Sequence, residues 1–508
     1  MIDPIDKVVI FNPRSADAKH RIPNSILQVA GSLGGAIPTV MIDGNMERNP
    51  LVVLQEELAN CKRPVLGVTV MPGPQLQQAI PFTLQLKAEI PNLLVIWGGY
   101  FASNQHRVVL NSGAIDFVIN GPADTAFPLL MTALSESEQP ALNDIPNLIF
   151  LADGKIVQTK KEAIPDMDNI APFPYAALDQ RYPLPEYLAK TFMGRKTLSY
   201  HSSFGCPFTC SFCAVVPIYN ARWKGLSPER MLEDIEWFRS NYAIDAVEFH
   251  DNNFFTSRKR VVDFAEGIKD KGIAWWGEGR IDTIDKYSDD DLELMREAGL
   301  RMIFLGAETG NDEVLKQMDK GGTQSGAQIK AFAGRLGRIG IIPEYSFVLG
   351  MPGKDDVSVM RQINEDIRFI REIKKINPET EIILYVYSPV PTEGSELFEE
   401  ITAQGFEFPA TLEDWLSPAW ERFDLRKNPL TPWLKAAHIQ RIKNFETVLN
   451  AYYPTQTDFR VRGWKKQLLR VLAFWRYHLG FYAAPYEIKL MHKIWRYRQP
   501  EEQGFYSE

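Results

Sequence analysis

The segment Gly205-Cys206-Pro207-Phe208-Thr209-Cys210-Ser211-Phe212-Cys213 contains three of the four cysteines in a chain of 508 residues. It follows an apolar run, Leu198–His201, which we expect to be a buried strand. A tight loop can turn three thiolates toward one point when they are spaced four and three residues apart. Three thiolates on a four-iron cluster leave one iron open to a small-molecule ligand, whereas four would close it. The segment therefore predicts a [4Fe–4S] cluster held by Cys206, Cys210 and Cys213, with one accessible iron.

A structural zinc site is the alternative for the same cysteines. Zinc in such sites takes four protein ligands, and only His201 is close enough in sequence to be the fourth, so we favour the cluster. The remaining cysteine, Cys61, stands alone before Pro64, and we expect it to be an inert thiol. Four cysteines cannot form a disulfide framework in a chain of this length, and they fit a reducing compartment.

The composition narrows the class of protein. Hydrophobic residues make up 45% and charged residues 24% of the chain, as in ordinary globular proteins, and the length suggests roughly three domains. The net charge of −8 gives no reason to expect a nucleic-acid partner. The sequence starts without a positively charged region before an apolar stretch, and it has no run of about 18 uncharged apolar residues. We therefore expect a cytoplasmic protein.

The first part of the chain alternates short apolar runs with helical patterns such as Gln75–Glu89. Five strands alternating with helices predict an α/β domain, with a doubly wound, Rossmann-like parallel sheet, over residues 1–140. Ligands of such sheets bind beyond the carboxyl ends of the strands, where small residues let them approach the backbone. The strands are predicted at Val8–Phe11, Thr39–Ile42, Val65–Val70, Leu93–Trp97 and Phe117–Ile119. They end in Asn12-Pro13-Arg14, Asp43-Gly44-Asn45, Thr69 and Gly98-Gly99.

A connector and a second alternating series follow. The connector covers residues 141–192. A β-hairpin is predicted there by Asp153-Gly154, which lies between two apolar runs, Asn147–Leu151 and Lys155–Gln158. A proline-rich, irregular segment follows the hairpin. Over residues 193–404, six strand–helix units predict a partial (β/α)6 TIM-like barrel, whose chemistry gathers at the carboxyl ends of the strands. Its strands are predicted at Leu198–His201, Ala246–His250, Ala274–Gly277, Met302–Gly306, Tyr345–Leu349 and Ile382–Tyr387, and helices such as Pro228–Tyr242, Asp289–Ala298 and Val357–Ile373 separate them.

The last part, residues 405–508, has no strand pattern and is predicted to be a helical, aromatic and basic extension. Between Arg460 and Arg498 there are ten basic residues and one acidic residue, Glu487. Two interpretations stay open. The extension is either a solvated cap whose aromatic side chains pack on the barrel, or a basic amphipathic surface that contacts an anionic membrane or a lipophilic substrate.

The cysteine segment, with an aromatic residue before its last cysteine, resembles the radical S-adenosylmethionine (SAM) superfamily. Segments after the later strands are similar to further motifs of that superfamily. These segments are Phe249–Phe254, Gly277–Arg280, Gly306–Gly310, Gly350–Gly353 and Ser388–Gly394. The resemblance implies that the open iron binds SAM, which is cleaved to a 5′-deoxyadenosyl radical with an electron from a flavodoxin- or ferredoxin-type donor. The residues expected to contact SAM are Phe212, His250, Asp251, Asn252, Arg280, Glu308, Gly350 and Tyr387. For Asp251 and Glu308, structural hydrogen bonds at the barrel rim remain the alternative.

The N-terminal region resembles the cobalamin (B12)-binding domain of one radical SAM subclass, through Trp97–Ser103 and Ile115–Gly121. It departs from that pattern at two places. The Asp-x-His-x-x-Gly motif, whose His binds cobalt, is absent after Asp43, and Gly121–Asp124 replaces the usual Gly-Glu-Gly-Glu. Many members of the subclass also lack the His, so the resemblance still implies cobalamin, with a vestigial scaffold domain as the alternative. The residues expected to contact cobalamin are Asn12, Arg14, Asp43, Gly44, Thr69, Gly98, Gly99, Tyr100 and Gly121.

Together the resemblances cover roughly residues 5–400 and imply a cobalamin-dependent C-methyltransferase. Its expected substrate is a small biosynthetic intermediate, lipophilic or anionic, with an unactivated carbon. The alternative is oxidative cyclisation, hydroxylation or ring rearrangement of the magnesium-protoporphyrin ester cyclase type, and a weaker one is a non-catalytic cobalamin-binding protein. The tRNA methylthiotransferases are excluded because Cys61 alone cannot build their second cluster. Of the seven histidines, only His201 and His250 are candidates for a role, because they flank the cysteine loop.

Overall fold

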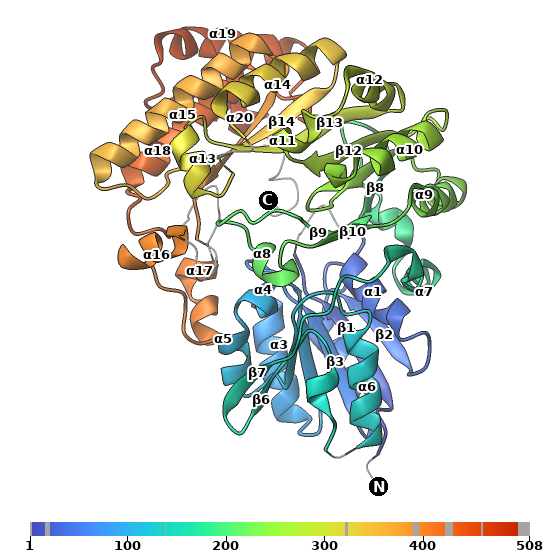
Figure 1. Ribbon diagram of the computed structural model, residues 1–508. Helices are drawn as coiled ribbons and strands as arrows, with labels where there is room; N and C mark the ends of the chain where they lie inside the picture. The colour runs from blue at the N-terminus through green and yellow to red at the C-terminus, as the bar shows by residue number, and fades with distance from the viewer. Residues whose placement is uncertain are drawn as a thin grey trace.

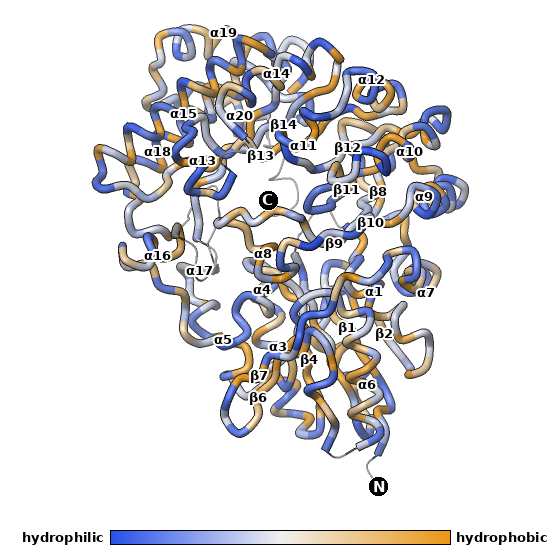
Figure 2. The backbone as a smooth tube through the Cα atoms, viewed as in Figure 1, coloured by the Kyte–Doolittle hydropathy of each residue, from blue (hydrophilic) through white to orange (hydrophobic). Residues whose placement is uncertain are grey.

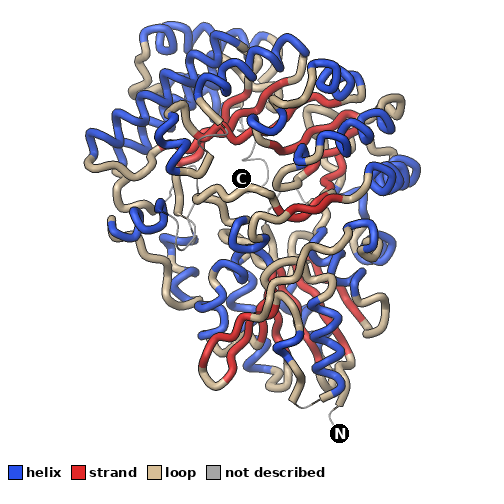
Figure 3. Tube along the Cα trace, viewed as in Figure 1, coloured by secondary structure: helices blue, strands red, loops and turns tan. Residues whose placement is uncertain are grey.

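The computed structural model describes residues 3–15, 21–137, 139–320, 324–389, 396–421, 430–458 and 461–495. It contains two large sheets in separate parts of the molecule and a helical C-terminal region (Figure 1). The N-terminal sheet and its helices lie in the lower half of Figure 1, and the barrel strands with their helices lie above them. Figure 3 shows the same arrangement by secondary structure, with loops passing between the two halves. The α/β class with two parallel sheets and a helical C-terminal region is thereby confirmed.

The N-terminal sheet has the strand order β2-β1-β3-β4-β5-β6-β7. The first five strands are parallel, and the order 2-1-3-4-5 is that of flavodoxin-like doubly wound folds. Side chains alternate between the two faces of a strand: Val8 and Ile10 lie in one hydrophobic cluster with α1 and α6, whereas Val9 and Phe11 lie in another with α2–α5. The parallel strands are β1 (Lys7–Asn12), β2 (Thr39–Asp43), β3 (Pro64–Thr69), β4 (Leu94–Gly98) and β5 (Phe117–Ile119); the helices are α1 (Asn24–Ser32), α2 (Pro50–Leu58), α3 (Leu76–Glu89), α4 (Gly99–Asn104), α5 (His106–Asn111) and α6 (Ala126–Glu136).

The predicted hairpin extends this sheet by two antiparallel strands, β6 (Leu148–Ala152) and β7 (Lys155–Gln158). Asp153 and Gly154 both have positive φ, 49° and 71°, as a two-residue type I′ turn requires. Lys161, just after β7, is bound to the barrel side of the molecule, because its Nζ donates to the Pro217 carbonyl at 2.8 Å. The connector continues through η2 (Met167–Asn169), α7 (Tyr175–Arg181) and η3 (Leu184–Tyr187).

The second sheet is an open barrel of six parallel strands in the order β8-β11-β12-β13-β14-β15, so strands successive in this series are neighbours. This is the predicted (β/α)6 topology. The strands are β8 (Thr197–Tyr200), β11 (Ala246–Phe249), β12 (Ala274–Gly279), β13 (Leu300–Glu308), β14 (Ile342–Leu349) and β15 (Glu381–Val386). The intervening helices are α9 (Pro228–Tyr242), α10 (Arg258–Ile268), α11 (Ile281–Ile284), α12 (Asp289–Glu297), α13 (Asp312–Gln317), α14 (Gly326–Ile339) and α15 (Asp356–Ile376), with η4 (Phe254–Thr256) after β11.

A short antiparallel pair that the sequence did not predict encloses the cysteine segment. β9 (Ser203–Gly205) pairs with β10 (Trp223–Gly225), and α8 (Val216–Tyr219) lies between them. Gly205 has φ 74°, and a Cβ there would come within 2.2 Å of the Arg222 carbonyl oxygen. The three cysteines therefore lie in a loop that is closed at its base by backbone hydrogen bonds.

The described C-terminal region is helical and contacts both halves of the molecule. Trp415 is buried and packs edge-on against Phe101 of the N-terminal domain, with ring centroids 5.0 Å apart, while Trp433 lies 6.0 Å from the ring of Tyr387 in the barrel. In the parts of the chain described here, no helix is long and apolar enough to cross a membrane. The helices are α16 (Glu396–Ala403), η5 (Glu413–Leu416), α17 (Pro418–Glu421), α18 (Ala436–Tyr452), α19 (Trp464–Leu479) and α20 (Tyr486–Ile494).

Candidate functional site

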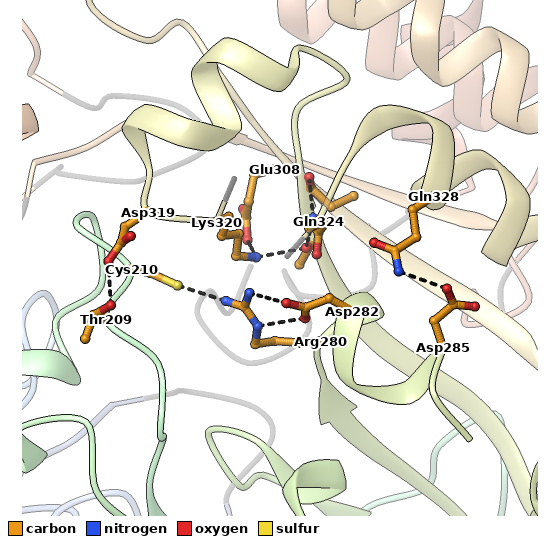
Figure 4. Close-up of polar contacts among 12 residues, drawn as sticks. Thr209, Cys210, Arg280, Asp282, Asp285, Glu308, Asp319, Lys320, Gln324 and Gln328 are labelled. Atoms are coloured by element: carbon orange, nitrogen blue, oxygen red, sulfur yellow. Dashed lines mark hydrogen bonds and ion pairs between the residues drawn. The ribbon is translucent and has the colours of Figure 1, made fainter. Parts of the chain in front are cut away.

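The cysteine loop is held against the turn that follows α13. Ser211 donates its backbone N–H to the Met318 carbonyl at 3.2 Å and its hydroxyl to the Gln317 carbonyl at 2.9 Å. Thr209 donates its hydroxyl to the Asp319 carboxylate at 2.5 Å (Figure 4). These contacts place the loop at the carboxyl end of the barrel strands, as the sequence predicts for the reactive centre.

All three thiols of the loop are free; Cys210 is buried, and Cys206 and Cys213 are half-buried. Burial raises the pKa of Cys206 and raises that of Cys213 to about 12, so ionising these thiols requires nearby positive charge or a metal. No three His, Cys, Asp or Glu side chains among the described residues converge on a point where one metal ion would bind. The thiolates of a four-iron cluster bind three different irons, so three free, separate thiols in one closed loop fit a cluster.

Arg280, at the end of β12, provides positive charge at the loop. Its Nη1 donates to the Cys210 sulfur at 3.0 Å, and its guanidinium lies 3.8 Å from the centroid of the Phe208 ring. A bidentate pair with Asp282, at 2.9 and 2.7 Å, fixes the orientation of the guanidinium (Figure 4). We predicted Arg280 as a SAM contact; its described partners are a cysteine, an aromatic ring and a carboxylate.

A second buried cation, Lys320, lies near Phe212 of the loop. Lys320 donates to the Glu308 carboxylate at 2.5 Å and to the Gly306 carbonyl at 2.9 Å, and its Nζ lies 5.8 Å from the Phe212 ring. Glu308 ends β13 with φ 62°, next to a register shift in the ladder with β14. The backbone strain at Glu308 is of the kind that clusters at functional sites, where surrounding contacts maintain it.

The segment after β11 divides into residues with different surroundings. Asp251 is buried and accepts hydrogen bonds from the Ser202 backbone N–H at 2.9 Å and from the Ser203 hydroxyl at 2.5 Å, which is the structural alternative considered for it. Asn253 is fully buried, and its side-chain amide is within hydrogen-bonding reach of the Cys206 thiol. It is therefore a second polar contact to the cysteine loop, besides that of Arg280.

Two of the predicted SAM residues, Gly350 and Tyr387, contact the C-terminal region. Trp433 donates its indole N–H to the Gly350 carbonyl at 2.9 Å and also packs near Tyr387, which is buried. Burial raises the pKa of Tyr387 above its usual range. Of the predicted motif Ser388–Gly394, residues 390–394 lie outside the described part of the chain.

A cavity of about 590 Å³ separates the carboxyl ends of the N-terminal strands from the barrel. Six of the nine residues predicted to contact cobalamin line it, and so do two predicted to contact SAM. The first set is Asn12, Thr69, Gly98, Gly99, Tyr100 and Gly121; the second is His250 and Asn252. Its volume lies within the usual range for ligand pockets, about 300–1,000 Å³.

Arg14, Asp43 and Gly44 do not line the cavity. Asp43 is buried and accepts hydrogen bonds from Tyr187 at 2.8 Å and Asn12 at 2.9 Å, and burial raises its pKa. Arg14 donates to the Gly44 carbonyl at 3.0 Å. These three residues are therefore part of a hydrogen-bonded loop that supports the cavity wall from behind.

The two predicted sets meet at one contact, where the Tyr100 hydroxyl donates to the Asn252 side-chain oxygen at 2.9 Å. His250 lies beside it, with Nε2 3.3 Å from Glu248 and Nδ1 3.7 Å from Glu278. His201 lines the same cavity and is exposed there. Glu278 is a cavity residue that the sequence analysis did not single out; its position in the Gly277–Arg280 motif was the available signal.

The three free thiols lie at the carboxyl ends of the barrel strands, and the doubly wound domain precedes the barrel in the chain. Residues 200–405 match the family described as the radical SAM superfamily, so this part of the chain carries a radical SAM domain. This domain implies a [4Fe–4S] cluster and SAM as cofactors.

Three relatives show how far the similarity extends. An uncharacterized methyltransferase of Pyrococcus horikoshii is 26% identical over 56% of this chain and 58% of its own length. The anaerobic magnesium-protoporphyrin IX monomethyl ester cyclase of Synechocystis sp. is 26% identical over 63% of this chain and 64% of its own. The hopanoid C-3 methylase of Methylococcus capsulatus is 24% identical over 48% and 45%. The chain thus spans less than two thirds of these relatives' lengths.

Two solved structures share the fold. The cobalamin-dependent radical enzyme OxsB with bound aqua-cobalamin has a TM-score of 0.68 at 16% identity, over 98% of this chain and 76% of its own. The radical SAM methyltransferase TsrM from Kitasatospora setae, with bound cobalamin and a [4Fe–4S] cluster, has a TM-score of 0.65 at 15% identity, over 97% and 99%. Likeness at this identity is likeness of fold, and it extends over both halves of the molecule.

Proposed function

We propose that this enzyme is cobalamin-dependent and transfers a methyl group to an unactivated carbon of a small, lipophilic biosynthetic intermediate. The observation that carries the proposal is the cavity of about 590 Å³ lined by both halves of the molecule. Methyl transfer from cobalamin to a substrate radical needs both cofactors to reach the same substrate, and this cavity gives them a common space. The fold likeness to OxsB and TsrM supports the proposal.

The wall of the cavity fits a large planar ligand at the strand ends. Gly98 has extended backbone, with φ −135°, and a Cβ there would meet nothing closer than the Ile119 carbonyl oxygen at 3.9 Å. Gly99 has φ 88°, and a Cβ on it would come within 2.8 Å of the Val70 carbonyl oxygen, so only glycine fits. The absence of side chains here leaves room for cobalamin to lie against the backbone.

The cluster and SAM would supply the radical that activates the substrate carbon. Cys206, Cys210 and Cys213 would hold the cluster, with Arg280 donating a hydrogen bond to the Cys210 sulfur. Lys320 would hold the Glu308 carboxylate in place at the rim, and the amide of Asn253 would contact the Cys206 sulfur. Tyr100 and Asn252 would fix the distance between the two halves. The contribution of the protein is positioning and exclusion of water, because the chemistry resides in the cofactors.

Two variants separate the two cofactor sites. Gly98→Val adds side-chain volume to the cavity wall, and its Cβ meets no backbone atom closer than 3.9 Å, so it should abolish cobalamin absorbance while keeping the cluster and the formation of 5′-deoxyadenosine. Cys210→Ala should lose the cluster and 5′-deoxyadenosine but retain cobalamin, which makes each variant the control for the other. If anaerobically purified wild-type protein binds no cobalamin, or if Gly98→Val binds it equally well, the proposal is wrong.

A second candidate is oxidative cyclisation or hydroxylation, which the similarity to the anaerobic cyclases favours. Methyl-deuterated SAM distinguishes the two reactions when the reconstituted enzyme is supplied with small-molecule extract. A product that carries the deuterated methyl group supports methylation. A product that has lost hydrogens or gained oxygen, without the label, supports the cyclase type.

Several sequence-based predictions also stay proposals. We propose a flavodoxin- or ferredoxin-type electron donor, a cytoplasmic location, contact of the C-terminal region with a membrane, and domain boundaries near residues 140, 192 and 404. The methylase of hopanoids, which are lipids, supports a lipophilic substrate.

A further inference from the structure

We propose that the outer face of α19 and α20 is a docking surface for an anionic lipid membrane. Ten of the 17 most exposed large apolar side chains among the described residues lie between residues 464 and 494, and the other seven are scattered over five elements and one loop. Single exposed apolar residues are normal, whereas a contiguous group marks an interaction site. The outer face consists of Trp464, Leu468, Val471, Trp475 and Leu479 on α19 and of Tyr486, Leu490 and Ile494 on α20.

The helix α19 exposes a stripe of large apolar side chains on the face that points away from the rest of the protein. Its residues Leu469, Ala473 and Tyr477 are buried against the protein. The five apolar residues of the outer face follow one another at intervals of four, three, four and four, so they form one stripe on the opposite side. Val471 is 70% and Leu479 is 77% exposed. A helix that turns an apolar stripe away from its own protein has another apolar medium to contact.

The second helix continues the same surface. Trp464 of α19 packs edge-on against Trp495, next to the end of α20, with centroids 5.7 Å apart, and Trp475 stacks on Phe481 in the turn between the helices at 5.6 Å. Figure 2 shows α19 at the outer edge of the molecule, with hydrophobic and hydrophilic stretches alternating along it. The aromatic residues on both helices suit a membrane interface, where Trp and Tyr are enriched.

The charge around this surface selects an anionic partner. Residues 461–495 contain seven basic residues and one acidic residue, Glu487, and Glu487 is already paired with Arg476, which donates to it at 3.0 Å. Lys465 lies with its Nζ 5.7 Å from the Trp495 ring, at the border of the apolar stripe. A second copy of this chain is a poor occupant, because a two-fold contact would bring two sets of like charges together. Anionic lipid headgroups are complementary to them.

Since no described helix can span a membrane, the contact would be of the interfacial kind, with the helices lying in the headgroup region. The proposal does not depend on the reaction: a protein with no methyltransferase activity would still bind vesicles, and an active enzyme would still fail to bind them if the proposal is wrong.

Flotation of the full-length protein with phosphatidylcholine vesicles, with and without phosphatidylglycerol, tests the inference. Wild type should float only with the anionic vesicles, and added salt should weaken binding. Lys465→Gln, Arg470→Gln and Lys493→Gln together should weaken it roughly a hundredfold, at about fivefold per charge. Val471→Ser with Leu479→Ser should weaken it more than tenfold. Val357→Ser is the matched control, because Val357 on α15 is 66% exposed and lies outside the outer face; it should bind as wild type does.

Three results would overturn the inference: no flotation with anionic vesicles, equal flotation with phosphatidylcholine alone, or patch variants that bind as well as wild type. A fourth is a stable dimer in light scattering that Val471→Ser with Leu479→Ser converts to a monomer, because the face would then be covered by a second copy. The substituted side chains are exposed, apart from the half-buried Lys465, so each variant should keep the circular dichroism spectrum and melting temperature of wild type.

Discussion

The buried pair of Lys320 and Glu308 gives a stability prediction that the structure quantifies. Both side chains are at most 7% exposed, and their charged atoms are 2.5 Å apart. Lys320→Met would leave the Glu308 carboxylate buried without its cation, which costs about 3–5 kcal/mol. For a domain of 150–250 residues each kcal/mol shifts the melting temperature by about 2–4 °C, so the barrel should melt about 6–20 °C lower. The assay is differential scanning calorimetry of the cluster-free protein, with the transition that changes in the variant taken as that of the barrel.

A double variant controls for the loss of the lysine itself. Glu308→Gln keeps the shape and the left-handed backbone position but removes the charge, so Lys320→Met with Glu308→Gln should recover most of the lost stability. If Lys320→Met melts within about 2 °C of wild type, removing the cation costs less than it does for a buried ion pair, and the prediction is wrong. If the double variant melts as low as Lys320→Met alone, the loss comes from packing and the electrostatic reasoning is wrong.

Three further predictions concern other contacts of the site. Arg280→Met with Asp282→Asn removes the hydrogen bond to Cys210 without leaving an unpaired charge. Because such a bond to a charged acceptor contributes about 1.5–3 kcal/mol, the one-electron reduction potential of the cluster should fall by about 65–130 mV. An EPR-monitored redox titration measures the potential, and an unchanged value contradicts the prediction. Burial raises the pKa of Asp366 to about 7. The stability that its protonated carboxyl group contributes is therefore lost as the pH rises from about 4 to about 7. Asp366→Asn should flatten the plot of melting temperature against pH over that range, and a plot parallel to that of wild type contradicts the prediction. Tyr100→Phe leaves Asn252 without its donor and should lower the unfolding free energy by about 1 kcal/mol in urea denaturation, whereas no change means that the contact between the halves contributes nothing.

The elements of the fold were predictable because periodicity is a local property. Each predicted barrel strand falls on an observed one, and α9 begins and ends at the predicted residues, Pro228 and Tyr242. The pair β9–β10 was missed, since three-residue strands inside a loop carry no pattern of two or 3.6 residues. Their existence depends on the long-range pairing of Gly205 with Trp223.

Site residues were predicted less completely, because roles depend on neighbours far away in sequence. Motif position identified Arg280 as important, yet it could not show that the guanidinium reaches the Cys210 sulfur, 70 residues away. Asp43 follows a strand at the expected edge, but Tyr187 from the connector binds its carboxylate and keeps it out of the cavity. Tyr387 was selected at a strand end, and only the fold shows that Trp433 packs near it.

The C-terminal helices show a limit of another kind. The pattern of α19 predicts an amphipathic helix equally well whichever face is buried, because periodicity fixes the stripe and not the side that the protein covers. In the structure, the buried face of α19 contains small side chains such as Ala473, and the apolar stripe with Val471 faces outward. In the isolated protein, exposure of this apolar stripe to water is unfavourable, because apolar surface is more stable in contact with other apolar groups. That cost is recovered only where the stripe meets a second apolar phase, and the surrounding basic residues make an anionic membrane surface the phase that this helix fits.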